Sequence, residues 1–183
     1  MKSEIPIHIV CTTDEAKQLI EAHKNFFVSN CGCREENGKC KQSRMDVCLN
    51  FYENTEASGS GKHTISTKEA EEIIKEAVNK KLVPRPFRSD DRKRIDGICF
   101  CCNDCCWYFR NRDEACDKGA FIEETNKTIC AHCGLCVDVC YFKARKRKDG
   151  VLFIDMEECY GCGLCVSECP NECIKMIKRN VIK

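Results

Sequence analysis

Residues 130–140 read CAHCGLCVDVC, and residues 159–170 read CYGCGLCVSECP. Both runs space four cysteines as Cys-x2-Cys-x2-Cys-x3-Cys, and eighteen residues separate them. Three thiolates separated by two residues can hold three corners of one iron–sulfur cubane, whereas the fourth cysteine of such a run ligates the neighbouring cubane. The doubled run therefore predicts one-electron chemistry before any fold is assigned.

The predicted ligands form two crossed sets. One 4Fe-4S cluster takes three cysteines of the first run and the last cysteine of the second run, and the other cluster takes the converse set. Zinc sites, the main alternative, use ligand pairs separated by longer gaps, and a disulfide framework is typical of small secreted chains. The assigned sets are Cys130, Cys133, Cys136 and Cys169 for one cluster, and Cys159, Cys162, Cys165 and Cys140 for the other.

From about Phe121 to Lys178 the chain resembles the bacterial two-cluster ferredoxins. The residues that carry the resemblance are the two cysteine runs with Gly134, Gly163 and Pro170. The resemblance implies a β-α-β-β-α-β arrangement with clusters close enough to exchange electrons. Two residues depart from the family pattern: Tyr141 replaces a frequent proline, and Cys173 replaces a small apolar residue. We expect Cys173 to pack as a small hydrophobe rather than to ligate.

Of the eleven cysteines upstream of the doubled run, nine are clustered within residues 31–48 and 99–106. Their density predicts metal ligation, because disulfides are rare in a reducing compartment. The spacing leaves open whether they hold one or two further iron–sulfur clusters, zinc as the less favoured choice, or a mixture. Adjacent cysteines either bridge two sites or divide between them. The candidate ligands are Cys31, Cys33, Cys40, Cys48, Cys99, Cys101, Cys102, Cys105 and Cys106.

These upstream cysteines fall into two groups, residues 31–48 and 99–106. The order Cys-x-Cys-Arg, then Asp-Val-Cys-Leu, a capped helix and Cys-x-Cys-Cys resembles the front half of poorly characterised ferredoxin-like proteins from anaerobes. The apolar stripe between the groups predicts a helix over residues 66–81, roughly 24 Å long. A loop follows this helix, so the chain can return to its start. We therefore predict that both groups converge on one metal-binding region.

The predicted fold class is α+β. A small, cysteine-rich α/β domain spans residues 1–118, and a two-cluster ferredoxin domain spans residues 119–183. Residues 4–10 are expected to form a strand. Capping-box spacing predicts two helix starts, at Thr12 and at Ser66. Pro84 and Pro86 are expected to break the second helix and to open a loop.

Composition limits the functional classes. The formal net charge is +1, with 32% charged residues. A cubane with four thiolates contributes about −2, so two clusters bring the protein to about −3. This acidity disfavours nucleic acid as a partner. The chain has no apolar run of about eighteen residues, which predicts no membrane insertion, and no signal-peptide core at its start, which predicts a reducing, anoxic cytoplasm.

The leading functional hypothesis is electron transfer between the ferredoxin clusters and an upstream metal centre, in the service of a partner oxidoreductase. The alternatives are an enzyme whose upstream cluster has an open iron, and a zinc-stabilised interaction module; the sequence leaves the oligomeric state open. Arg34 either donates to a cluster sulfur or is a surface charge. Residues 143–148 form either a solvated turn or a docking patch for an acidic partner. His63 is a further ligand candidate, His132 is expected to tune the solvent exposure of a cluster rather than to ligate it, and Cys11 and Cys116 are expected to be structural.

Overall fold

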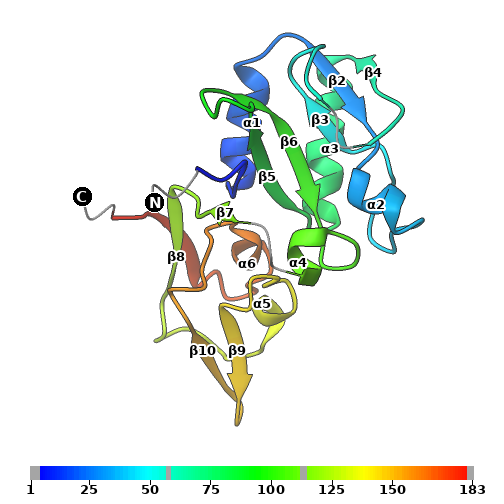
Figure 1. The fold of residues 1–183 in the computed structure, drawn as a ribbon. Coiled ribbons are helices and arrows are strands. Elements are labelled where there is room, and N and C mark those ends of the chain that lie inside the picture. Colours follow the sequence, from blue (N-terminus) through cyan, green and yellow to red (C-terminus); the bar gives the residue numbers. More distant parts are fainter. Residues whose placement is uncertain (1–4, 57–58, 112–114, 181–183) are drawn as a thin grey trace.

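The computed structural model describes residues 5–56, 59–111 and 115–180. The N-terminal half is built on a seven-stranded sheet with the order β4-β2-β3-β6-β5-β1-β7 (Figure 1). Every neighbouring pair is antiparallel except β1 and β7. The strands are β1 His8–Ile9, β2 Phe26–Ser29, β3 Cys48–Asn50, β4 His63–Ile65, β5 Val83–Arg88, β6 Ile95–Cys101 and β7 Cys116–Asp117.

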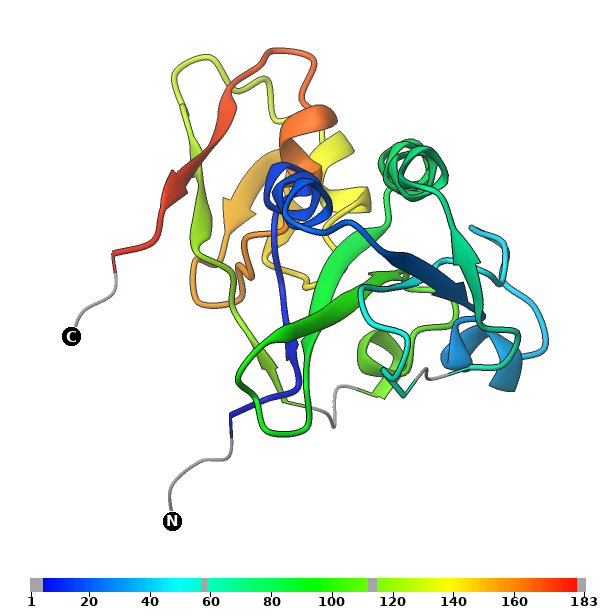
Figure 2. The ribbon, with the colours of Figure 1, turned by 90° about the horizontal axis from the view of Figure 1, so that it is seen from above.

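Two amphipathic helices, α1 (Thr13–Glu21) and α3 (Thr67–Asn79), pack together on one face of this sheet. Both helices begin with the predicted capping box, in which the N-cap hydroxyl and the glutamate three residues later satisfy each other's backbone N–H groups. The shorter helices α2 (Gly32–Glu36) and α4 (Trp107–Asn111) lie on the other side of the sheet (Figure 2). The sheet was expected to be α/β in type, but its strands are nearly all antiparallel, so this half is α+β.

Two local predictions differ from the structure. The first strand covers only His8–Ile9 rather than residues 4–10, whose first residue lies outside the described part. Pro84 and Pro86, expected to open a loop, instead lie inside β5. Within a strand the N and C=O of one residue point to the same side, and the Pro84 carbonyl accepts from Cys11 N on the β1 side. The missing proline N–H groups therefore face β1, where pairing is short, and the ladder to β6 is kept.

The C-terminal half contains its elements in the order β-α-β-β-α-β. Strands β8 and β11 pair antiparallel, and β9 and β10 form a separate hairpin (Figure 1). Each short helix follows a cysteine loop. The elements are β8 Phe121–Thr125, α5 Leu135–Asp138, β9 Arg145–Lys148, β10 Val151–Ile154, α6 Leu164–Ser167 and β11 Ile174–Lys178.

The two halves are in direct contact. The Tyr108 ring packs against Phe142 and Tyr160, and Lys81 of the N-terminal half forms an ion pair with Glu168. Strand β7 ends at Asp117 and β8 begins at Phe121, on either side of the boundary expected at residue 118. In the described part of the chain, no helix is both long enough and apolar enough to cross a membrane.

Candidate metal centres

The eight cysteines of the doubled run line two separate pockets. The first pocket is lined by Cys130, Cys133, Cys136 and Cys169, and the second by Cys140, Cys159, Cys162 and Cys165. Each pocket therefore receives three cysteines from one run and the last cysteine from the other run. These are the two sets that the spacing predicts, and all-cysteine donors of this kind fit an iron–sulfur cluster.

Glycines shape both cysteine loops. Gly134 and Gly163 immediately precede α5 and α6, with φ angles of 91° and 79°. This left-handed conformation strains residues that carry a Cβ, so glycine suits the turn from loop to helix. Gly161 is also required by space, because a Cβ there would lie 2.0 Å from the Phe121 carbonyl oxygen. Close approach of β8 to the second loop therefore depends on that glycine.

The two pockets differ in exposure. Cys133 of the first pocket is exposed, and it is alone in this among the twenty cysteines, all of which lie in the described part. Cys173 also lines the first pocket; it is buried, and its Sγ lies 3.2 Å from the Cys169 Sγ. The Nδ1 atom of His132 accepts a hydrogen bond from the backbone N–H of Leu152, so the imidazole ring is held against β10. The first pocket is therefore the solvent-facing one.

A buried ion pair connects the pockets. Arg145 donates to Glu123 at 2.5 Å and to the Cys136 Sγ at 3.4 Å, and only 2% and 3% of the two charged side chains are exposed. Burial opposes the charged form of Arg145, but the nearby Cys165 and Glu123 raise its pKa. Arg145 also lines the second pocket, so a single guanidinium lies beside both sets of cysteine thiols.

Comparison with known families supports this geometry. Residues 122–170 match the family described as the 4Fe-4S dicluster domain. The C-terminal half of the chain thus contains a ferredoxin-like iron–sulfur domain, here called the dicluster domain. No curated protein matches the chain.

The structure brings the two upstream cysteine groups together, as predicted, but it divides their thiols among three assemblies instead of one shared region. Thiols from residues 31–48 contact thiols from residues 99–106 at several points. The alternation of side chains along β6 explains how the thiols of residues 99–106 are divided between the two faces of the sheet. Ile98 and Phe100 point into the core beneath α1 and α3, so Cys99 and Cys101 lie on the opposite face. Of the adjacent pairs, Cys102 and Cys105 join the helix-side core, whereas Cys101 and Cys106 join the core shared with the dicluster domain.

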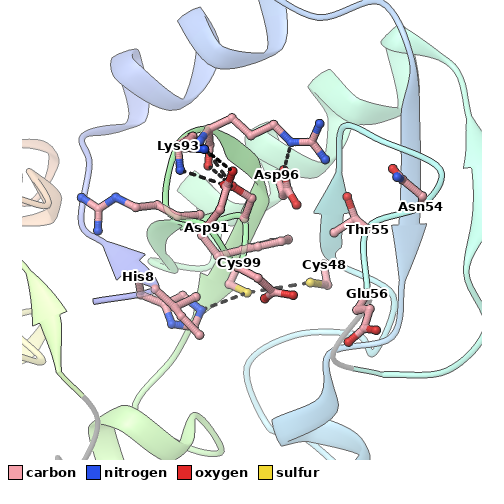
Figure 3. A pocket seen from close by; sticks show the side chains of 15 residues that line it. His8, Cys48, Asn54, Thr55, Glu56, Asp91, Lys93, Asp96 and Cys99 are labelled. Atoms are coloured by element: carbon pink, nitrogen blue, oxygen red, sulfur yellow. Dashed lines mark hydrogen bonds and ion pairs between the residues drawn. The ribbon is translucent and has the colours of Figure 1, made fainter. Parts of the chain in front are cut away.

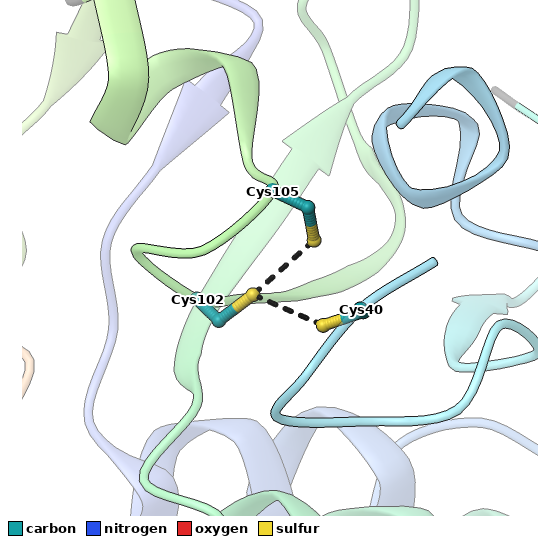
Figure 4. A group of neighbouring side chains, drawn as sticks. All are labelled: Cys40, Cys102 and Cys105. Carbon is teal, nitrogen blue, oxygen red and sulfur yellow. Dashed lines mark hydrogen bonds between the residues drawn. The ribbon is translucent and has the colours of Figure 1, made fainter. Parts of the chain in front are cut away.

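The first of three assemblies is the three-thiol group, Cys40, Cys102 and Cys105 (Figure 4). The Cys102 Sγ lies 3.6 Å from that of Cys40 and 3.3 Å from that of Cys105. Burial opposes ionisation of Cys40, but the backbone N–H groups of Gln42 and Ser43 lower its pKa. A tetrahedral ion with metal–sulfur bonds of about 2.3 Å places its sulfurs about 3.8 Å apart. The group thus has the dimensions of a single-ion site.

The four-thiol group comprises Cys31, Cys33, Cys101 and Cys106, linked in series by thiol hydrogen bonds. Hydrogen bonding with Cys106 lowers the pKa of Cys33 and of Cys101, and it raises the pKa of Cys106 itself. Arg85 adds positive charge, since it lies 3.8 Å from the Cys101 Sγ and 3.6 Å from the Cys106 Sγ. In the described part, only the three-thiol group has all its donor atoms within 4.8 Å, so these four thiols are more widely spread.

Two buried arginines face these thiols. The sequence suggested Arg34 as either a sulfur donor or a surface charge; only 1% of it is exposed, so the surface reading is wrong. It donates to the carbonyls of Arg44 and Phe100, and its Nε is buried without a partner. Burial opposes its charge, but Cys31, Cys102 and Cys40 raise its pKa. The sequence analysis did not identify Arg85 as a residue of this site, although its position between two prolines marks it as unusual.

The third assembly is the dithiol pair, Cys48 and Cys99, with Sγ atoms 3.8 Å apart. His8 lies beside it, with Nε2 3.9 Å from the Cys99 Sγ. Both cysteines and His8 line a cavity of about 690 Å³ (Figure 3). Neither the pairing of these two cysteines nor His8 was predicted, because they depend on strand register. His63 is exposed in β4 with its Nδ1 on the Gly61 carbonyl.

Aromatic side chains fill the space between the four-thiol group and the second pocket. Arg85 stacks over Tyr108 at 4.3 Å, and Tyr108 packs against Phe142 and Tyr160. Phe142 and Tyr160 are stacked, with ring centroids 4.4 Å apart. One apolar cluster holds these rings with Cys101, Cys106 and Cys162. The junction of the two halves is therefore packed with aromatic side chains.

Proposed function

We propose that the chain is an iron–sulfur electron-transfer protein. In this proposal the dicluster domain exchanges single electrons both with a partner oxidoreductase and with a metal centre in the N-terminal half. When bound, 4Fe-4S clusters supply reversible one-electron transfer. The observation that carries the proposal is the continuous apolar cluster from Cys101 and Cys106 through Tyr108 and Phe142 to Cys162, which joins the two sets of thiols. The Arg85 guanidinium lies against the N-terminal end of this cluster, on the Tyr108 ring.

The N-terminal thiols suit two different cofactors. The four-thiol group has enough donors for one further cubane, and its spread exceeds that of a single-ion site. The three-thiol group suits one tetrahedral ion, zinc or iron, because its sulfurs are closely spaced. Arg34 and Arg85 offset the negative charge of the thiolates in both groups and orient them.

The exposed side of the dicluster domain is the proposed docking side for the partner. Cys133 is the exposed ligand candidate, and the side chain of Arg147 passes within 3.2 Å of a Cβ built on Gly134. Lys146, Arg147 and Lys148 are exposed on the β9–β10 hairpin, while Arg145 points inward. An acidic surface on a partner complements this hairpin and places the partner beside the first pocket.

Metal analysis of the anaerobically purified full-length protein tests the proposal. We expect more than about eight irons per chain, because two cubanes account for about eight and the four-thiol group adds more. Cys106→Ser should lower the iron content by about four, whereas Cys116→Ser, outside the three assemblies, should leave it unchanged. An iron content near eight in both the wild type and Cys106→Ser would refute the N-terminal cluster.

One observation favours an enzyme as the second candidate. The three-thiol group offers three sulfurs, and the buried Arg34 Nε beside it has no partner. An ion held by three protein ligands keeps a position for substrate. Small anions such as cyanide should then change the spectrum of a cobalt-substituted protein; an unchanged spectrum contradicts an open position.

A further inference from the structure

The dithiol pair is positioned for reversible disulfide formation. Leu49 pairs with Ile98, so the same register places Cys48 directly opposite Cys99. Phe51 N donates to the Asp96 carbonyl, which makes residues 51 and 96 a hydrogen-bonded pair. Pairs alternate along an antiparallel ladder, so residues 48 and 99 form a non-hydrogen-bonded pair, whose Cα atoms are about 4.5 Å apart. Disulfides bridge Cα separations of about 4.4–6.8 Å.

The pair is accessible from the large cavity. Cys99 is partly exposed and Cys48 is 2% exposed, and both line the cavity wall (Figure 3). Charged side chains of both signs, among them Arg88, Lys93, Asp91 and Asp96, form other parts of the wall. A volume of about 690 Å³ is in the range of small-molecule sites, which are about 300–1,000 Å³. A small substrate can thus reach Cys99 first.

The pair also adjoins the four-thiol group. Cys99 and Cys101 lie two residues apart on the same face of β6. Arg85 is paired with Cys99 across β5 and β6 and contacts the thiols of Cys101 and Cys106. A single metal ion held by Cys48, Cys99 and His8 is disfavoured by geometry. Among the described residues, closely grouped donor atoms occur at the three-thiol group and not at Cys48, Cys99 and His8.

We propose that Cys48 and Cys99 are a redox-active dithiol that reduces a small disulfide substrate bound in the cavity. The Cys99 sulfur attacks one substrate sulfur, a mixed disulfide forms, and the first substrate thiol leaves with the proton that Cys99 gives up. The Cys48 sulfur then attacks the Cys99 sulfur, the second substrate thiol leaves with the Cys48 proton, and the Cys48–Cys99 disulfide remains. Two electrons and two protons restore the dithiol. The electrons come from the one-electron carrier in the C-terminal half, so this last step rests on the proposed function.

The test uses the anaerobic full-length protein and hydroxyethyl disulfide as the probe. After exposure, remaining thiols are alkylated and the digested protein is analysed by mass spectrometry. We expect a cross-linked peptide that joins Cys48 to Cys99, two fewer alkylated thiols and two mercaptoethanol molecules released per chain. Cys48→Ser should stop at a mixed disulfide on Cys99, Cys99→Ser should release no mercaptoethanol, and Cys116→Ser should behave as the wild type.

Three results separate this proposal from the electron-transfer proposal. If no Cys48–Cys99 peptide forms although the clusters are present and reducible, the dithiol is refuted. If Cys48→Ser lowers the metal content, the pair is a ligand set and the dithiol is likewise refuted. If the peptide forms but a photochemically generated one-electron donor re-reduces it equally fast in Cys106→Ser, the dithiol stands and the internal electron route is refuted.

Discussion

The buried Arg145–Glu123 pair gives the sharpest test of how the dicluster domain is held together. Arg145→Met keeps most of the side-chain volume but removes the guanidinium, which donates to Glu123, Thr125 and the Cys136 Sγ. Glu123 then remains as a carboxylate with 3% of its side chain exposed and without its cation. The loss of stability in this variant therefore measures the free-energy cost of burying the Glu123 carboxylate without its cation.

Breaking a buried ion pair by removing one partner costs about 3–5 kcal/mol, because an uncompensated charge stays buried. At a urea dependence of about 2 kcal/mol per molar, this free energy lowers the unfolding midpoint by roughly 2 M. Replacing both partners, as in Arg145→Met with Glu123→Leu, removes the orphan charge and should recover most of the loss. The double variant still lacks the donor to Cys136, so the cluster in the first pocket should keep a lowered reduction potential.

The assay is anaerobic urea unfolding followed by far-ultraviolet circular dichroism and by cluster absorbance, with cluster potentials from redox titration. Lys146→Met is the matched control, since Lys146 is the exposed next residue of the same strand. The reasoning is refuted if Arg145→Met shifts the midpoint no more than Lys146→Met does. It is also refuted if the double variant is no more stable than Arg145→Met alone, because the orphan carboxylate would then not be the cause.

Three further predictions concern the metal sites and one helix. Replacing Cys169 and Cys173 together by alanine should remove about four irons and the signal of the first-pocket cluster in electron paramagnetic resonance; loss of the second-pocket signal instead would refute crossed ligation. Cys102→Ser should remove one metal ion per chain, measured by mass spectrometry of metals, and an unchanged content would contradict the single-ion site. Ser66→Ala should lower the free energy of unfolding by about 1 kcal/mol, because Ser66 accepts from Glu69 N, and no change in the urea midpoint would contradict this.

The features that the sequence predicted well are local. Capping boxes at Thr12 and Ser66 depend on residues three apart, and the cysteine spacing of the doubled run also fixes which thiols share a loop. Burial was harder to foresee. Arg34 looks like a surface residue in sequence, but the carbonyls of Arg44 and Phe100 satisfy its guanidinium, and these lie ten and sixty-six residues away.

The division of the upstream thiols among the three assemblies could not be predicted from the sequence, because it depends on the register in which the strands pair. Cys48 meets Cys99 because β3 pairs with β6, and Arg85 meets Cys99 because β5 pairs with β6. A shift of one residue in either ladder would turn these side chains to the opposite face. The prolines of β5 added to the difficulty, because their tolerance depends on the short pairing with β1, which is a tertiary feature.

The adjacent cysteines show how one short segment serves two sites. Cys101 ends β6 on the face that meets the dicluster domain, and Cys102, the next residue, points to the helix-side core. Four residues later, Cys106 returns to the first side and donates to Cys101. A single chain reversal therefore builds part of both thiol groups and holds them at a fixed separation. Because Tyr108 follows directly in α4 and packs on Phe142, the same reversal also anchors the dicluster domain. Any change that displaces this segment should disturb metal binding and the contact between the halves together.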